Sequence, residues 1–302
     1  MPGCPASQPG ITYDEPTRGT LQLFRTRKQF DGSAADIAVL QRSGVGFQLL
    51  DAAGCIEHEP ALATVREKFV GGLLLPGDET GDCFKFTQRL AELAAERGVT
   101  FRQSVRIESL VRSGARLEGV QTDAGRLVAD AYLLALGSYS ALLLKPLGIR
   151  IPVYPVKGYS ITVPIVDPSG APELTVMDET HKVAVTRLGD RIRGGTAELA
   201  GYTLKLHEAR RHTLEHVVGD LFPRGGDLSK AEFWCGLRPR TPDGTPIVGP
   251  TEIGNLYLAT GHGTLGWTMA AGTARVIADL MSKRTPEIDL VGLTLARYRQ
   301  SP

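Results

Sequence analysis

An apolar stretch that runs into a glycine-rich turn and then into a helix constrains the fold more than any other part of the chain. Residues 255–260 (NLYLAT) have the composition of a buried strand, and residues 261–266 (GHGTLG) follow directly. A helix is expected next, because Ala270, Ala274 and Ile277 recur at helical spacing. A strand, a glycine turn and a helix in this order are typical of an α/β domain.

The turn matches the pattern G-x-G-x-x-G of a dinucleotide-binding loop. Only 36 residues follow Gly266, however, and no second strand with its acidic residue is recognisable after Met281, so a βαβ unit cannot be completed there. Two interpretations remain. The glycines either only allow the chain to turn, or the free N–H groups of the helix seat an anion, such as the charge on a reduced flavin.

The rest of the chain predicts a mixed α/β (α+β) fold. Residues 131–136 (AYLLAL) read as a central strand buried on both faces. A helix is expected from the small polar segment Thr80-Gly81-Asp82, which can cap it, to Gly98. The pattern then predicts a second domain with a largely antiparallel sheet and a helix over 204–221. Further elements are expected at 19–30, 33–43, 99–102, 105–111, 117–122, 126–129, 159–163 and 182–186.

Charge and cysteine content exclude several classes of protein. The 34 Lys and Arg nearly balance the 33 Asp and Glu, so nucleic acid is not an expected partner. Four distant cysteines form no C-x-x-C pair, which favours a reduced, cytoplasmic chain. No apolar run reaches the roughly 20 residues of a membrane span, so we expect only peripheral membrane contact. Residues 1–10, rich in Pro and Gly, are expected to be disordered.

Five segments, in this order, resemble the D-amino acid oxidase superfamily of FAD-dependent oxidoreductases. They are residues 19–26 (GTLQLFRT), 78–82 (DETGD), 155–160 (PVKGYS), 236–246 (GLRPRTPDGTP) and 261–268 (GHGTLGWT). The resemblance extends over roughly residues 11–300 and is most specific to the small-subunit type of bacterial D-amino acid dehydrogenase.

This resemblance implies an FAD domain of the glutathione-reductase-like type, built from non-contiguous pieces and interleaved with a substrate domain. Residues 76–149 and 236–302 would supply the FAD-domain pieces, and residues 11–75 and 150–235 the substrate domain. The family's N-terminal strand, glycine loop and helix bind the ADP pyrophosphate, and none of them is recognisable here. We therefore expect a truncated form with an incomplete FAD domain, or a second chain that supplies the segment.

The resemblance also implies site residues. Arg238, in the GLRP segment, would hold the substrate carboxylate, which suits the bidentate fork of a guanidinium. Tyr159 would add a hydroxyl or cover the pocket, and Arg187 is a second candidate cation. The alternatives are a structural arginine at 238, ordinary packing of Tyr159 and a solvent-facing Arg187.

For the cofactor, the resemblance implies that the backbone of Val105 holds the adenine and that Gly137 and Ser138 approach FAD at a strand end. The alternatives are a core valine and a plain turn. The flavin pyrimidine edge is expected against the turn and helix start formed by Gly261, Gly263, Thr264, Leu265, Gly266 and Trp267. No metal site is expected. His212 and His216 share a helix face, but His207-Glu208 is followed by a histidine at 212 rather than at 211, so H-E-x-x-H fails by one residue and solvated helix histidines are expected.

The implied activity is oxidative deamination of a D-amino acid such as D-alanine by hydride transfer to flavin N5. The products would be a 2-oxo acid and ammonia, and the electrons would pass to the respiratory chain at the inner face of the membrane. The alternatives are a glycine- or sarcosine-oxidase-like enzyme and a non-catalytic remnant that does not retain FAD.

A first prediction concerns the 302-residue chain expressed as printed. We expect it to bind FAD only weakly, because no pyrophosphate-binding glycine loop is recognisable in it. Titration with FAD, followed by flavin fluorescence, measures this. Saturable binding with a sub-micromolar dissociation constant would contradict the expectation.

Overall fold

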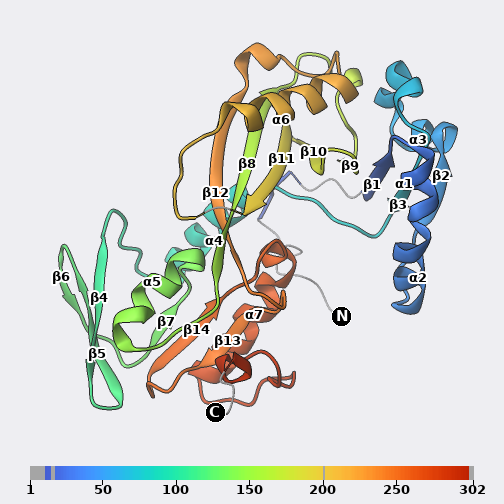
Figure 1. Cartoon of the computed structure of the whole chain (residues 1–302). Coiled ribbons are helices and arrows are strands. Elements are labelled where there is room, and N and C mark those ends of the chain that lie inside the picture. Colours follow the sequence, from blue (N-terminus) through green and yellow to red (C-terminus); the bar gives the residue numbers. More distant parts are fainter. Residues whose placement is uncertain (1–10, 15–17, 200, 299–302) are drawn as a thin grey trace.

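The computed structural model describes residues 11–14, 18–199 and 201–298. In Figure 1 the upper part contains a large sheet, and the lower part contains two smaller sheets with the C-terminal helix. The order of the large sheet is β12-β8-β11-β10-β9-β1-β3-β2. Its strands are β1 (Thr20–Phe24), β2 (Gln48–Asp51), β3 (Gly71–Leu75), β8 (Tyr154–Pro164), β9 (Thr175–Asp178), β10 (Val183–Leu188), β11 (Arg191–Leu199) and β12 (Glu232–Arg240).

The large sheet is antiparallel except where β1 lies parallel to β9. Because side chains alternate between the faces of a strand, Tyr159, Ile161 and Val163 of β8 all lie on one face. Helix α6 (Glu208–Leu221) covers this face. Its buried positions, spaced as one helical stripe, are Leu214, Val217, Val218 and Leu221.

The lower part has its own core. A three-stranded sheet has the order β13-β14-β7, with β7 (Tyr132–Leu134) parallel to β14 (Leu256–Thr260) and β13 (Ile247–Pro250) antiparallel. Helix α7 (Gly266–Met281) buries Val276 and Ile277 beside Val248 of β13. The other small sheet consists of β4 (Ile107–Ser113), β5 (Arg116–Thr122) and β6 (Gly125–Leu127).

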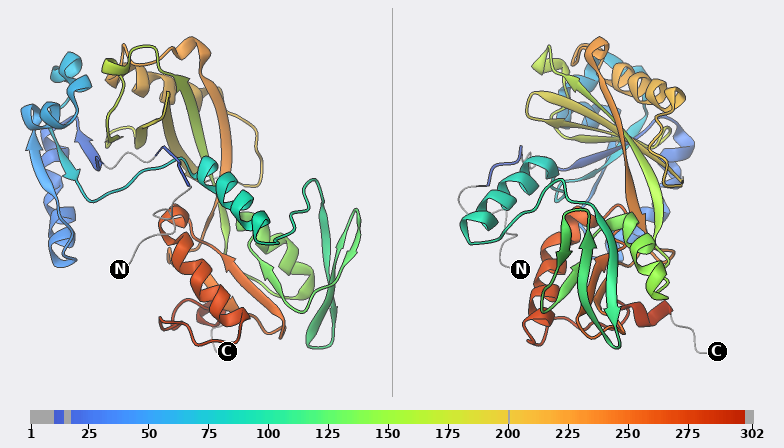
Figure 2. Two further views of the ribbon diagram at one scale, coloured as in Figure 1. Left: turned by 180° about the vertical axis from the view of Figure 1, so that it is seen from behind. Right: turned by 90° about the vertical axis from the view of Figure 1, so that its left-hand side faces the viewer.

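The remaining helices pack around these sheets. They are α1 (Arg27–Gly32), α2 (Ala34–Arg42), α3 (Ala52–His58), α4 (Cys83–Glu96) and α5 (Ser140–Leu144). Short 3₁₀ helices span Pro60–Lys68, Gly137–Tyr139, Lys145–Leu147, Pro168–Gly170, Leu228–Lys230 and Leu295–Tyr298. Helix α4 begins near the large sheet, where its N-cap Asp82 binds Arg191 of β11 at 2.8 Å. Figure 2 shows α4 running down beside the lower part of the molecule.

The predicted fold class is confirmed, and several predicted elements occur close to their expected bounds. Asp82 caps α4 by accepting hydrogen bonds from two backbone N–H groups, and Gly98 follows the helix with φ +90°. The strand before the glycine turn and the helix after it are β14 and α7. No strand follows α7 within the described residues to Tyr298, as expected. The domain boundaries at 75, 149 and 235 stay a prediction.

Three expectations were wrong. Residues 99–102 form no strand, and α6 begins at Glu208 rather than at 204 because residues 201–207 are exposed and have no core to pack against. The third is the stretch 131–136, which forms only a short strand that is not buried on both faces. Leu133 is 42% exposed, because β7 pairs with β14 alone and lies at the edge of its sheet in the described part of the chain.

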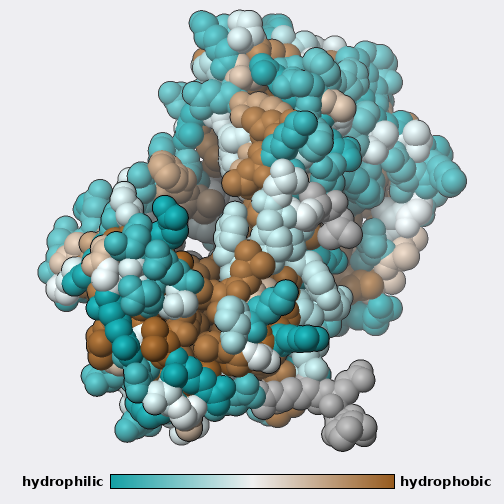
Figure 3. Space-filling model, turned by 60° about the vertical axis from the view of Figure 1, so that its left-hand side comes forward, coloured by the Kyte–Doolittle hydropathy of each residue, from teal (hydrophilic) through white to brown (hydrophobic). Residues whose placement is uncertain are grey.

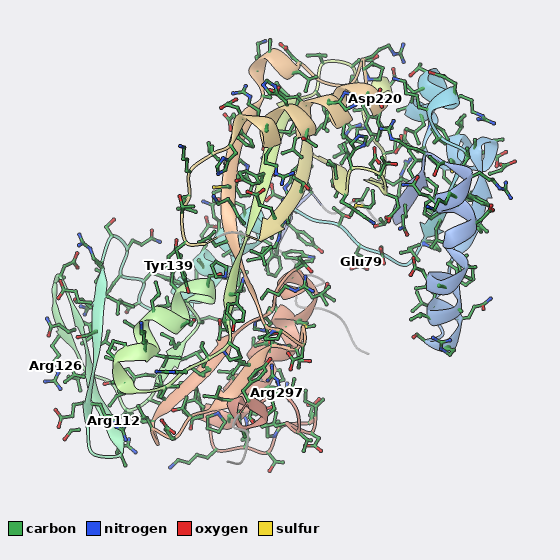
Figure 4. All side chains as sticks on the ribbon, viewed as in Figure 1. Glu79, Arg112, Arg126, Tyr139, Asp220 and Arg297 are labelled. Atoms are coloured by element: carbon green, nitrogen blue, oxygen red, sulfur yellow. The ribbon has the colours of Figure 1, made fainter. Side chains whose placement is uncertain are left out.

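A charged network joins β1, β9 and α6. Arg25 Nε donates to Asp178 at 2.8 Å, and Arg25 Nη1 donates to Asp220 at 2.6 Å. Lys68 also binds Asp220, which lies on α6 at the top of the molecule in Figure 4. The Asp178 side chain is completely buried, and the Arg25 guanidinium helps to hold the pKa of this carboxyl below its usual value although burial opposes it.

We predict that Arg25→Met destabilises the protein by about 3 kcal/mol at pH 7, because it removes the arginine that pairs with the buried Asp178 carboxylate. The matched control is Arg27→Met, whose exposed pair with Asp31 should contribute less than about 1 kcal/mol. Urea denaturation measures both. Because the folded pKa of Asp178 is lowered, its contribution is present above the unfolded pKa and is lost as pH falls through the folded pKa. Equal losses in the two variants would contradict this account.

Candidate active site

A pocket of about 220 Å³ opens on the face of the large sheet that α6 does not cover. Strands β8, β11 and β12 form its floor, and β12 lies beside β8 with Gly236 directly opposite Gly158. The pocket is lined by Gly158, Tyr159, Ser160, Arg193, Trp234, Gly236, Leu237 and Arg238. A glycine pair at its centre leaves room for the side chains of the neighbouring positions.

The guanidinium of Arg238 lies flat across Gly158. A Cβ at position 158 would come within 2.6 Å of the Arg238 Cζ, so this arrangement requires a glycine. The Nη1 atom of Arg238 is buried and has no hydrogen-bond partner among the described residues, and no carboxylate there pairs with this arginine. Burial, together with the nearby Arg193, lowers the pKa of Arg238. A buried cation without a counterion is costly, so the pocket is suited to an anion.

Arg193 is the second arginine of the pocket, and the sequence reasoning did not find it. It lies on β11, where Gly194 and Gly195 hide the strand signal. The available signal was its alternation with Ile192, which faces the core. Burial lowers the pKa of Arg193. Its Nε donates to Ser160 Oγ at 3.0 Å.

The two other predicted substrate contacts lie elsewhere. Tyr159 reaches the pocket wall, but its ring packs in the core under α6, 5.8 Å from the ring of Phe233, and its hydroxyl donates to Glu198 at 2.7 Å. Arg187 donates to the carbonyls of Gly189 and Pro168 and does not line the pocket. The geometry therefore does not bring Tyr159's hydroxyl or Arg187 to Arg238.

The glycine turn after β14 is attached to the strand that carries Arg238. The N–H of Gly263 donates to the carbonyl of Pro239 at 2.7 Å, and His262 forms a bridge with Arg240. Gly261 has φ +80°, and a Cβ there would meet Thr241 Cγ2 at 2.7 Å. The turn thus continues directly from the end of the arginine pocket.

Helix α7 begins at this turn without a side-chain cap. Its N-cap, Leu265, makes no side-chain hydrogen bond, so the first N–H groups of a 16-residue helix have no intrahelical partner. Thr264 and Leu265 are exposed. Trp267 packs edge-on against Phe86 of α4, with ring centroids 5.2 Å apart. These features give the helix start a positive electrostatic character and a fixed position beside α4.

Gly137 and Ser138 meet the same region from β7. Ser138 Oγ donates to the carbonyl of Leu237 at 3.3 Å, and Thr260 Oγ donates to the carbonyl of Gly137 at 2.9 Å. Val105 lies in the irregular connection between α4 and β4. It lines neither the arginine pocket nor the apolar groove beside α7. Its proposed contact with adenine stays a prediction.

A larger, mainly apolar groove of about 530 Å³ lies beside the turn. Small residues along α7 form one wall, which faces β7 and β14. Figure 3 shows hydrophobic side chains gathered on the lower half of the molecule. The groove is lined by Leu133, Pro239, Ala259, His262, Gly263, Gly266, Ala270, Thr273, Ala274, Ile277 and Ala278. Pro239 therefore lies between the groove and the arginine pocket.

Metal-ligating side chains do not gather in the described part of the chain, where no group of three or more His, Cys, Asp or Glu is placed to hold an ion. The three helix histidines point to different partners: His207 lies near the Tyr159 ring, His212 near Glu215, and His216 near His181. Of the cysteines, Cys4 lies outside the described residues, and Cys55, Cys83 and Cys235 are free thiols.

Comparison with known proteins gives a consistent result. Residues 6–280 match the family described as "FAD dependent oxidoreductase". A D-amino acid dehydrogenase from Bradyrhizobium diazoefficiens is 63% identical over 96% of this chain and 69% of the relative. Another from Xanthobacter autotrophicus is 62% identical over 98% of this chain and 70% of the relative.

Solved structures share the fold. Glycine oxidase from Geobacillus kaustophilus superposes with a TM-score of 0.85 and 25% identity, over 98% of this chain and 79% of that one. L-proline dehydrogenase from P. horikoshii gives a TM-score of 0.79 at 20% identity, over 95% of this chain and 78% of that one.

Gly158 and Gly236, which lie opposite each other in the pocket, allow two matched substitutions to be compared. We predict that Gly158→Ala displaces the Arg238 guanidinium and weakens the binding of acetate at least about tenfold, the loss of one charge-assisted contact. Gly236→Ala, directly opposite, should bind acetate almost normally, because its Cβ would meet only the Trp234 ring at 3.8 Å. Calorimetric titration with acetate measures both. Equal affinities would show that Arg238 does not need the space above Gly158.

Proposed function

Because the chain belongs to the family of FAD-dependent oxidoreductases, we propose that it oxidises D-amino acids to 2-oxo acids and ammonia. The observation that carries this proposal is Arg238, a half-buried arginine without a carboxylate partner in the described residues. Its Nη1 is buried and unpaired, and it lies near the end of the strand attached to the glycine turn. An α-amino acid carries the carboxylate that such a site requires.

FAD is the cofactor of this family, and the residues around the turn fit it. The uncapped N–H groups at the start of α7 would hold the electron-rich pyrimidine edge, with the segment from Gly261 to Trp267 as its binding surface. Gly137 and Ser138 would approach the cofactor from the opposite strand end. When bound, FAD supplies the acceptor for the hydride that leaves the substrate α-carbon.

The chain's own residues then have to bind and orient the substrate. Arg238 would form two parallel hydrogen bonds to the carboxylate, which fixes both its position and its plane. Because the residues after Arg238 on β12, Pro239 and Arg240, are bound to the glycine turn, the carboxylate would be held at a set distance from the cofactor surface. Such positioning contributes to rate by restricting the α-carbon to one orientation.

A glycine-oxidase-like activity is the second candidate, and the structural likeness to glycine oxidase favours it. The two relatives with the name D-amino acid dehydrogenase described above are 63% and 62% identical to this chain, whereas the glycine oxidase is 25% identical. We therefore favour D-amino acids as substrates. Comparing flavin reduction by D-alanine, glycine and sarcosine distinguishes the two candidates.

The destination of the electrons is a further part of the proposal. We propose a respiratory-chain acceptor and peripheral contact with the inner face of the cytoplasmic membrane. None of the described helices is long and apolar enough to span a bilayer. Reduction of a quinone analogue in the presence and absence of lipid vesicles would test the acceptor and the contact separately.

In the FAD-loaded protein at its full natural length, we predict that Arg238→Ala and Arg238→Lys lower kcat/KM for D-alanine by roughly ten- to hundredfold, or about 1.5–3 kcal/mol. Lysine should not rescue, because an ammonium cannot form the planar fork. Anaerobic flavin reduction measures the effect, and the flavin spectrum checks that FAD stays bound. Wild-type rates and affinity in both variants would make Arg238 a structural residue.

A further inference from the structure

Two arginines, and not one, approach the centre of the pocket. We propose that Arg193 is the second arm of the carboxylate site and that Ser160 positions it, so that the substrate carboxylate is held between two guanidinium groups. This inference rests on the proposed function, because it assumes that an amino acid occupies the pocket.

The strand register shows how the two side chains converge. Arg193 lies opposite Thr162 of β8, and Arg238 lies opposite Val156. These backbone positions are six residues apart along β8, or about 20 Å. The guanidinium of Arg238, however, lies over Gly158, and Arg193 Nε is bonded to Ser160. Positions 158 and 160 are only about 7 Å apart on one face of β8, so the two side chains converge on the same part of the pocket.

A glycine also lies beside the Arg193 side chain, although only Gly158 is required for lack of space. Gly195 of β11 lies opposite Ser160, and a Cβ at 195 would come within 3.4 Å of the Arg193 Nη2. Gly158 and Gly195 therefore form a flat floor over which both side chains extend. A larger side chain at either position would narrow the space in which the guanidiniums approach each other.

Neither arginine has an acidic partner in the described part of the chain. The nearest candidate for Arg193 is Asp82, but its carboxylate is bound by Arg191 at 2.8 Å and by the backbone of α4. Arg25 and Arg191, by contrast, are paired with carboxylates. Two neighbouring uncompensated cations repel each other, and an anion between them removes this repulsion.

Ser160 gives Arg193 a defined orientation. Its Oγ accepts from Arg193 Nε at 3.0 Å and donates to the carbonyl of Gly194 at 3.1 Å, so the hydroxyl is used in both directions. The ring of Trp234, which lies on β12, is 5.9 Å from the Arg193 Cζ. With Nε occupied, the two Nη groups remain for the substrate. Ser160 is therefore a positioning residue, since it acts through Arg193.

The test uses the FAD-loaded protein at its full natural length with four variants: Arg193→Gln, Arg193→Lys, Ser160→Ala and, as a matched control, Arg126→Gln. Arg126 lies on β6 in the lower part, paired with the exposed Glu118 (Figure 4). Anaerobic flavin reduction at varied D-alanine gives the apparent dissociation constant and the limiting rate, and calorimetric titration with acetate gives carboxylate binding without turnover.

We expect Arg193→Gln to raise the dissociation constants of D-alanine and acetate about tenfold, as loss of one charge-assisted contact should. Arg193→Lys should recover part of this loss, because it keeps the charge but not the fork. Ser160→Ala should raise both constants a fewfold with little change in the limiting rate, and Arg126→Gln should change neither. If Arg193→Gln does not fold, the lysine and Ser160 variants still decide the question.

The inference is overturned if Arg193→Gln and Ser160→Ala bind acetate and D-alanine like wild type while Arg238→Ala does not. It is also overturned if Arg193→Gln weakens only D-aspartate, because Arg193 would then contact a substrate side chain. A wild-type protein that no D-amino acid reduces, but whose acetate binding requires both arginines, would refute the proposed function and support the two-arginine site.

Discussion

Strand β12 is the element on which the geometry of the site depends. It pairs with β8 over nine residues, which anchors it in the large sheet. Its last residues bind the turn before α7, through the hydrogen bond from Gly263 to Pro239 and the bridge from His262 to Arg240. The strand that carries Arg238 is thus joined directly to the glycine turn. Their separation is set by the β12–β8 ladder, one backbone hydrogen bond and one β-bridge rather than by side-chain packing alone.

The chain treats its buried arginines in two different ways. Arg25 is surrounded by Asp178 and Asp220, so its charge is neutralised and contributes to the joining of β1, β9 and α6. Arg193 and Arg238 have no such partners in the described residues, and the desolvation cost of each stays uncompensated. The free energy of desolvating such an arginine has to be offset by another interaction, such as the binding of an anion. A structural ion pair such as that of Arg25 needs no bound anion.

How far the sequence predicts this molecule depends on whether the signal is local. The strand, turn and helix over 255–281 could be predicted, because apolar periodicity and glycine placement are properties of neighbouring residues. β11 could not, since its consecutive glycines and charged residues weaken the strand pattern, and its identity comes from pairing with β8 and β10. The stretch 131–136 was read as a buried strand because composition reports apolar character but not the number of strand neighbours.

The residues of the candidate site also differ in whether their signal is local or arises from pairing between strands. Arg238 was recognised through its segment, but its dependence on Gly158 arises from cross-strand register and cannot be read along the chain. Arg193 was missed for the same reason, and Tyr159 was expected to use its hydroxyl in the pocket because its face of the strand was unknown. Function at this site is carried by residues that become neighbours only when the sheet forms.

The glycine floor of the pocket has a consequence for changing substrate preference. Because Gly158 and Gly236 line the centre of the pocket without side chains, its depth there is set by the sheet itself and cannot be increased by shortening a side chain. Of the side chains around this glycine pair, Leu237 can be made larger or smaller, whereas Trp234 lies 5.9 Å from the Arg193 Cζ and its replacement would change the surroundings of that arginine. Redesign of this pocket would therefore change its width and not its depth.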